Sequence, residues 1–175
     1  SSMFSARLWW SLRYYGHSRV AVLDGGWQKW IRENRPTTAE IPTIPPKQFT
    51  PRTNPALLRS GDEVQAVLSS ATRIIDVRSP EEFAGKSSRA KRRGHIPGAV
   101  NLPRADLVTP DGLVPSPEML RAKFTQAGVS ETSPQPIFYC NGGVSASYGL
   151  LALTVAGLHG TVYDGSWKDW GNDDS

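Results

Sequence analysis

The 175-residue chain has one cysteine, three widely spaced histidines and no apolar run of the roughly 18 residues that a membrane-spanning helix needs. One cysteine excludes an internal disulfide, and with only His17, His95 and His159 beside it, classical zinc-finger spacings are excluded too. No charged segment followed by a plain apolar core, the pattern of a signal peptide, opens the chain. We therefore expect a soluble cytoplasmic protein without a bound metal or other cofactor.

Acidic residues are fewer than basic ones, which leaves a formal charge of +4 and a pI near 9.4. Much of the excess lies in residues 86–93, Lys-Ser-Ser-Arg-Ala-Lys-Arg-Arg. No aromatic residues alternate with these cations as stacking platforms would require, so we expect no nucleic-acid partner. A solvated loop and a cationic rim that attracts small anions to a nearby pocket both remain open.

The single cysteine, Cys140, follows an apolar run at 137–139. It opens a loop of five residues: Asn141, Gly142, Gly143, Val144 and Ser145. Such a run bounded by glycine predicts a buried strand, and the composition after the loop predicts a helix. Backbone N–H groups of the loop and of the helix N-terminus would then favour a thiolate, the nucleophilic form. A buried, inert cysteine is the alternative, and the adjacent glycines and serine favour the reactive site.

Residues 5–30 have a second copy in residues 145–170. Each copy predicts an apolar helix, a glycine at its C-terminal end, a short strand, and then Asp-Gly-x-Trp-x-x-Trp. The counterpart of Cys140 would fall immediately before Ser1, so residues 1–34 are predicted to be the C-terminal remnant of a similar, non-catalytic domain. Without a domain of their own, the tryptophans of this remnant need a surface on the second domain or on another chain: Trp9, Trp10, Trp27 and Trp30. Self-association through the remnant is one expected outcome.

Residues 35–54 are rich in proline and threonine and predict an extended linker, which leaves 55–175 as the catalytic domain. Ser60 and Ser79 are predicted N-caps. Helices are expected at 60–69, 79–83, 117–127 and 145–158. Strands are expected at 73–77, 136–139 and 161–163, and a turn that leads into a strand at 94–102. This alternation predicts an α/β fold with a parallel sheet flanked by helices on both faces. Ligands bind beyond the C-terminal strand ends of such sheets, which is where Cys140 lies.

Four segments resemble the rhodanese family of sulfurtransferases in its two-domain form. They are Asp-Val-Arg at 76–78 with Glu-Glu-Phe at 81–83, Gly-His-Ile-Pro-Gly-Ala at 94–99, the loop at 140–146, and Tyr-Asp-Gly-Ser-Trp at 163–167. Residues 4–30 are similar to the end of the family's catalytically silent first domain. The resemblance implies that the Cys140 thiolate attacks the outer sulfur of thiosulfate or 3-mercaptopyruvate and becomes a persulfide. The sulfur then passes to cyanide or a thiol.

The resemblance also implies roles for the loop. Its N–H groups from Asn141 to Ser145 would hold the anionic persulfide, with the Ser145 hydroxyl as a further donor and the glycines giving backbone freedom. Glu82 stands at the position of the family's substrate arginine. Arg89 lies near the position of a second substrate arginine that mercaptopyruvate-type relatives have, which makes Arg89 a candidate substrate cation. Asp76, Arg78 and His95 are expected to be structural.

Donor preference stays open at this point. The loop lacks the basic pair of thiosulfate-preferring relatives, and it has Asn-Gly-Gly where mercaptopyruvate-preferring relatives have Gly-Ser-Gly.

Two other enzyme classes are disfavoured. A cysteine phosphatase needs an arginine six residues after its cysteine, and that position holds Ala146. A Cys–His hydrolase needs an imidazole partner that the sequence does not place. The serious alternative is a catalytically impaired fragment that acts as a sulfur carrier or regulatory binding module.

Overall fold

The computed structural model describes residues 2–173, and at its centre lies a five-stranded parallel sheet in the order β1-β5-β4-β2-β3. The strands are short: β1 (Leu58–Arg59), β2 (Ile74–Asp76), β3 (Val100–Asn101), β4 (Ile137–Tyr139) and β5 (Thr161–Tyr163). Strands β2, β4 and β5 are buried along their whole length. This is the doubly covered parallel sheet that the alternation of elements predicted.

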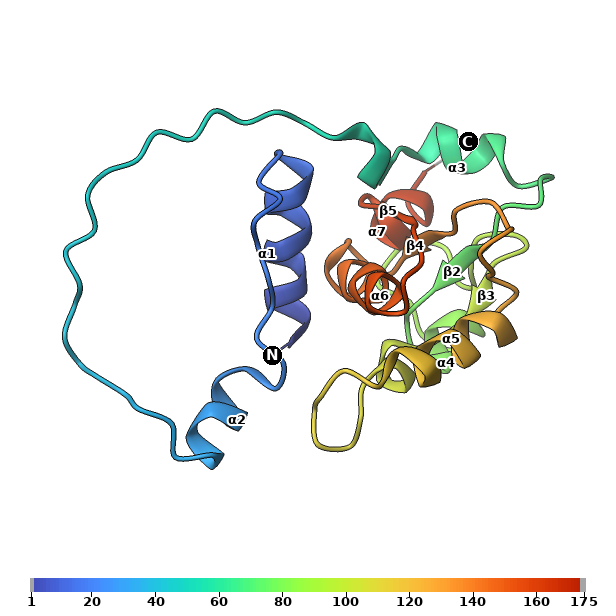
Figure 1. The fold of residues 1–175 in the computed structure, drawn as a ribbon. Coiled ribbons are helices and arrows are strands. Elements are labelled where there is room, and N and C mark those ends of the chain that lie inside the picture. The colour runs from blue at the N-terminus through green and yellow to red at the C-terminus, as the bar shows by residue number, and fades with distance from the viewer. Residues whose placement is uncertain (1, 174–175) are drawn as a thin grey trace.

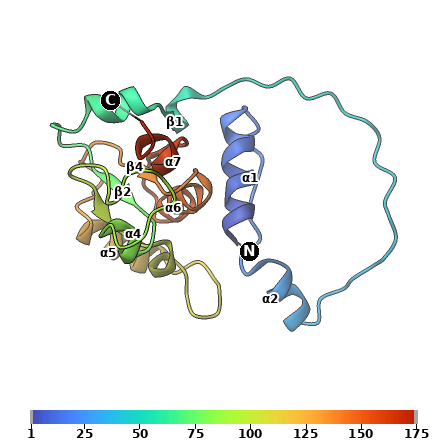
Figure 2. The same ribbon diagram turned by 180° about the vertical axis from the view of Figure 1, so that it is seen from behind.

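Helices cover both faces of this sheet (Figures 1 and 2). The helices are α1 (Ser2–Tyr14), α2 (Gly26–Arg32), α3 (Gly61–Ala66), α4 (Pro80–Phe83), α5 (Pro117–Gln126), α6 (Val144–Val155) and α7 (Ser166–Trp170), with 3-10 turns at Pro55–Leu57 and Arg104–Leu107. Ile75 and Phe138 share a core with α1, α5 and α6, whereas Ile74 and Ile137 face α3 and α7. Successive strand residues thus enter opposite cores, as the period of two requires.

Local capping explains where two of the short helices begin. The Ser79 side chain accepts a hydrogen bond from the Glu82 N–H at 3.2 Å, and the Glu82 carboxylate accepts one from the Ser79 N–H at 3.4 Å. Ser60 and Glu63 form the same capping box at α3. Both boxes satisfy N–H groups that the first turn would otherwise leave unpaired. The sequence prediction of both caps is therefore confirmed.

The N-terminal segment packs on the rest of the chain through α1, which lies beside α6 in both views. Trp9 and Trp10 are buried in the core that α6 shares, and the Trp10 indole N–H donates to the Leu57 carbonyl at 3.1 Å. Trp27, on α2, is 65% exposed. Of the expected surfaces for these tryptophans, the core formed with the later part of the same chain thus accommodates those of α1.

One sequence expectation is wrong in this region, and one strand was missed. Residues 20–23 form no strand, since none of the described strands lies beside them, although Val20 and Val22 pack against the main core. Strand β1 was not expected, and it exists because Leu58 and Arg59 pair with Val162 and Tyr163 of β5. The linker at 35–54 contains no helix or strand and forms a wide arc in Figure 1.

The order α1–α2 parallels α6–α7, and one backbone detail links them. Gly26 and Ser166 occupy the same place in the Asp-Gly-x-Trp motif, and they adopt nearly equal left-handed φ values of 53° and 56°. This agreement supports our proposal of a tandem origin. Phe4 and Leu8 of α1 are 63% and 61% exposed, and self-association through this face stays a prediction.

Candidate functional site

Cys140 is the first residue after β4, at the C-terminal edge of the sheet. It is only 5% exposed and lines a cavity of about 650 Å³. The walls of this cavity come from the first turn of α1, from the segments after β2 and β3, from the loop at 140–145 and from α7. The position agrees with the general rule that ligands bind beyond strand ends in parallel sheets. A reagent therefore reaches the thiol through this cavity.

The side chain of Ser166 holds the loop in place from α7. Its Oγ accepts hydrogen bonds from the N–H groups of Cys140 at 3.2 Å and Gly143 at 3.1 Å, and donates to the Tyr163 carbonyl at 2.8 Å. The N–H of Trp167 donates to the Cys140 carbonyl at 2.9 Å. Sequence reasoning missed Ser166, although its place in the repeated Asp-Gly-x-Trp motif was a usable signal.

Gly143 has to be glycine for two reasons. Its φ is 76°, in the left-handed region, and a Cβ added there would lie 2.0 Å from Asp164 Oδ1. Asp164 is held by an ion pair with Arg7 of α1, so its carboxylate cannot withdraw freely. Gly142, in contrast, is exposed and a Cβ there would meet nothing within 4 Å. Of the two expected glycines, the structure therefore requires only Gly143.

The other predicted loop residues have partners of their own. The Ser145 hydroxyl donates to Met3 Sδ at 3.2 Å, and the Gly143 N–H is already bound by Ser166. In this conformation both groups therefore already have a hydrogen-bond partner other than Cys140. Val144 and Ser145 lie in the first turn of the 12-residue helix α6, where backbone N–H groups lack intrahelical acceptors. These N–H groups are therefore candidate donors for an anion in the cavity.

Glu82 stands in the cavity wall and orders the loop. Its Oε1 accepts a hydrogen bond from Asn141 Nδ2 at 2.8 Å. The candidate substrate cation Arg89 also lines this cavity, with Nε 3.7 Å from the same carboxylate oxygen and 77% of its side chain exposed. The structure therefore brings Arg89 to the site but places its charge beside a carboxylate.

Arg78 and Asp76 form a buried fork at 2.6–3.0 Å, and the same guanidinium donates to the Gly94 carbonyl at 2.8 Å. Burial lowers the pKa of Arg78, but the hydrogen bonds and charge of Asp76 outweigh it, so the net shift is upward. His95 stacks on Phe83 at 3.7 Å and its Nδ1 contacts the Phe83 carbonyl at 2.8 Å. All three side chains have the structural contacts expected of them.

Two cations that no motif singled out also line the Cys140 cavity: Arg104 and Lys168. Arg104 begins the 3-10 turn after β3, and its guanidinium lies 5.9 Å from the ring centre of Tyr148. Lys168 belongs to α7, and its N–H donates to the Asn141 carbonyl at 3.0 Å. Since each comes from a different part of the sequence, only the tertiary structure reveals that they share a cavity.

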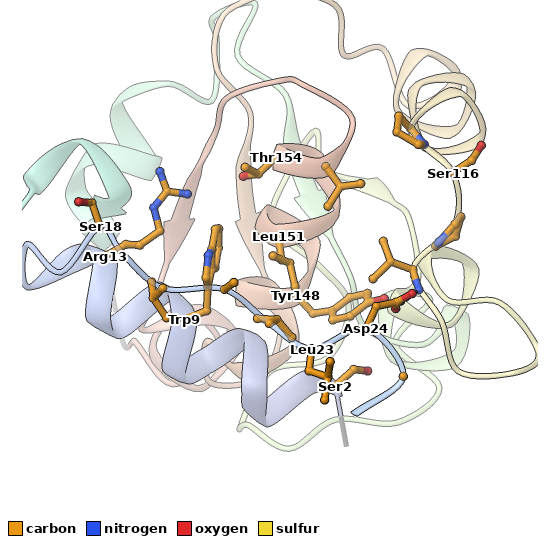
Figure 3. A pocket seen from close by; sticks show the side chains of 18 residues that line it. Ser2, Trp9, Arg13, Ser18, Leu23, Asp24, Ser116, Tyr148, Leu151 and Thr154 are labelled. Carbon is orange, nitrogen blue, oxygen red and sulfur yellow. Dashed lines mark hydrogen bonds between the residues drawn. The ribbon is translucent and has the colours of Figure 1, made fainter. Parts of the chain in front are cut away.

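A second cavity, of about 610 Å³, lies between α1, the segment after it, the start of α5 and α6 (Figure 3). Trp9 from one side and Tyr148 and Leu151 from the other give it an apolar lining. Its lining residues include neither cysteine nor histidine. Among residues 2–173 no group of three or more His, Cys, Asp or Glu could hold a metal ion, and no helix is long and apolar enough to cross a bilayer. The nucleophile therefore distinguishes the Cys140 cavity as the candidate site.

Comparison with known proteins agrees with the fold. Residues 60–173 match the family described as the rhodanese-like domain. A thiosulfate sulfurtransferase of Mus musculus is 36% identical, over 97% of this chain and 59% of its own length. A 3-mercaptopyruvate sulfurtransferase of Homo sapiens is 33% identical, over 96% of this chain and 58% of its own. Sulfur carrier protein TtuD of Thermus thermophilus is 34% identical, over 98% of this chain and 65% of its own length.

Among solved structures, a variant of EanB in complex with ergothioneine is 25% identical and superposes with a TM-score of 0.87. That alignment covers 98% of this chain and 43% of the EanB chain. The chain also spans less than two thirds of the length of the three relatives named above. The similarity therefore concerns one part of each of these longer proteins.

Proposed function

The chain belongs to the rhodanese-like domain family, and on that premise we propose that it is a sulfurtransferase in which Cys140 carries the sulfur. The observation that carries this proposal is the single cysteine at the end of β4, buried at the wall of a 650 Å³ cavity beside the N-terminus of a helix. Relatives named thiosulfate and 3-mercaptopyruvate sulfurtransferase, similar over nearly the whole chain, support it.

The proposed reaction has two steps. The Cys140 thiolate attacks the outer sulfur of the donor, a new S–S bond forms, and the bond between that sulfur and the rest of the donor breaks with its electron pair. Sulfite leaves when the donor is thiosulfate, and the enolate of pyruvate, which then takes up a proton, leaves when it is 3-mercaptopyruvate. In the second step cyanide or a thiolate attacks the outer sulfur of the persulfide and releases the Cys140 thiolate.

The loop assists both steps through charge and position. The persulfide formed on Cys140 is an anion, and the first-turn N–H groups of α6 are the donors that would stabilise it. The bonds from Ser166 and Trp167 hold the Cys140 backbone still, so the sulfur keeps its place when the donor leaves. No metal takes part in this scheme.

Production of thiocyanate from cyanide tests the proposal, with thiosulfate and with 3-mercaptopyruvate as donors in parallel. We expect turnover with at least one donor and none in Cys140→Ser, which keeps the size and polarity of the side chain. Absence of turnover with both donors would refute catalysis.

A second candidate is a sulfur carrier that is loaded but does not turn over. Glu82 in the cavity wall, where a cation was expected, favours it, and one relative is named a sulfur carrier protein. Both candidates predict a persulfide on Cys140. Repeated turnover in the thiocyanate assay supports the enzyme, and a single equivalent of product supports the carrier.

A further inference from the structure

We propose that Arg104 and Lys168 form the anion-binding subsite of the Cys140 cavity. The subsite would take the negatively charged end of a small donor: the sulfonate-like group of thiosulfate or the carboxylate of 3-mercaptopyruvate. This inference rests on the proposed function for the identity of the anion as a sulfur donor. The subsite replaces the arginine that the resemblance placed at Glu82.

Backbone contacts fix both cations on segments that flank the cysteine. The N–H of Arg104 donates to the carbonyl of Val77, the first residue after β2, at 3.0 Å. The N–H of Lys168 donates to the carbonyl of Asn141, the second residue after β4, at 3.0 Å. Because β2 and β4 are neighbouring parallel strands, their C-terminal ends are adjacent, and Arg104 and Lys168 are both held at this edge of the sheet. Both line the cavity that contains Cys140.

The charge balance of the cavity selects these two residues. Its other cations are compensated: Arg78 by Asp76 in the buried fork, and Arg89 by Glu82 at 3.7 Å. Within residues 2–173 neither Arg104 nor Lys168 forms an ion pair. The uncompensated positive charge of the cavity therefore lies on Arg104 and Lys168. A cavity lined by one sign of charge concentrates anions of the opposite sign.

A structural role is the competing explanation for Arg104, since its guanidinium lies over the Tyr148 ring. A contact of 5.9 Å with a ring face leaves the charge uncompensated and the edge of the guanidinium free for planar, two-point binding of an oxyanion. Lys168 is exposed, and its side chain forms neither an ion pair nor a contact with an aromatic ring among the described residues. The two roles differ in a measurable way, because only an anion subsite changes the reactivity of Cys140 toward charged reagents.

Because Cys140 is the single cysteine, alkylation reports on it alone. The test compares the rate constants for iodoacetate, which is an anion, and iodoacetamide, which is neutral and of similar size. We expect the ratio of the iodoacetate rate to the iodoacetamide rate to be higher for Cys140 than for a small free thiol such as N-acetylcysteine. This ratio should fall as salt is added. Arg104→Gln and Lys168→Gln should each lower the ratio about three- to tenfold, as the loss of one nearby charge at an intermediate dielectric implies.

Matched controls separate a local effect from a change in net charge. Arg19→Gln and Lys47→Gln remove the same charges from exposed positions outside the cavity and should leave the ratio within about twofold. Lys168→Arg keeps the charge and should keep the ratio. The iodoacetamide rate of each variant checks that the loop still holds Cys140 in place. An unchanged ratio in both Arg104→Gln and Lys168→Gln overturns the subsite.

The steady-state KM for thiosulfate gives the second readout. If the variants lower the alkylation ratio and raise this KM with little change in kcat, the subsite binds the donor. If the ratio falls but no donor transfers sulfur to the wild-type protein, the anion subsite stands and the proposed sulfur transfer fails. If transfer occurs and neither the ratio nor the KM changes, the proposed function stands and the subsite fails.

Discussion

Ser166 is the residue whose loss should disturb the cysteine loop most. Its hydroxyl is fully buried and makes three hydrogen bonds, two accepted from the N–H groups of Cys140 and Gly143 and one donated to the Tyr163 carbonyl. Ser166→Ala leaves all three backbone groups without this partner. An unsatisfied buried polar group costs roughly 1–3 kcal/mol, and with partial relaxation we expect a total loss of unfolding free energy of about 2–5 kcal/mol.

The backbone at Ser166 supplies an internal comparison. Because φ is 56°, alanine would keep the left-handed strain while losing the hydrogen bonds. Ser166→Gly loses the same bonds but removes the strain, as Gly26 shows at the matching place of the first repeat with φ 53°. We therefore expect Ser166→Gly to be more stable than Ser166→Ala by about 1 kcal/mol.

Equilibrium urea unfolding, followed by tryptophan fluorescence, measures both differences from the transition midpoint and slope. Ser147→Ala is the matched control, because Ser147 is equally buried but makes one side-chain hydrogen bond, to a Gly143 carbonyl that also accepts from the Ser147 N–H. It should lose only about 1 kcal/mol. A loss below about 0.5 kcal/mol in Ser166→Ala, or equal stability of the alanine and glycine variants, would refute this account of the loop.

Three further outcomes follow from the structure. Glu82→Gln keeps an acceptor for Asn141 Nδ2 but removes the carboxylate, so the KM for thiosulfate should fall about threefold in steady-state assays; a rise would contradict it. Trp10→Ala should reduce the free energy of unfolding in urea by about 3–5 kcal/mol, because this ring is buried between α1 and the main core. Trp27 is exposed, so Trp27→Ala should change the free energy of unfolding by no more than about 0.5 kcal/mol. Equal losses in the two variants would refute the packing role of α1. Burial raises the pKa of Tyr139, Tyr148 and Tyr163, so their contribution to stability is complete below the ordinary pKa of about 10 and is lost as pH rises above it. In an ultraviolet titration these phenols should ionise only together with unfolding. Normal titration of these phenols in the folded protein would contradict this.

The elements with local signals could be predicted from the sequence. Ser60 and Ser79 begin helices because their capping partners lie three residues away, and the apolar run at 137–139 forms β4 because it is buried on both faces. Cys140 accordingly lies at the strand end where it was expected. These features depend on neighbours in sequence, which a reader of the sequence can see.

Features that depend on a distant partner could not be predicted in the same way. The two residues of β1 are too few to show an alternation of apolar and polar side chains. They form a strand only because they pair with the edge of β5. The run at 20–23 has strand composition, but no described strand lies beside it. The repeated Asp-Gly-x-Trp motif was a usable signal for Ser166. The two cations of the proposed subsite reach the cavity only through the tertiary structure, so their spacing in the sequence carried no signal.

The persulfide on Cys140 is the central claim, and intact mass spectrometry under non-reducing conditions tests it most directly. After incubation with thiosulfate or 3-mercaptopyruvate, the wild-type protein should gain the mass of one sulfur atom and lose it again when cyanide is added. Cys140→Ser should gain nothing. The account is contradicted if neither donor produces the adduct, or if Cys140→Ser acquires the same mass.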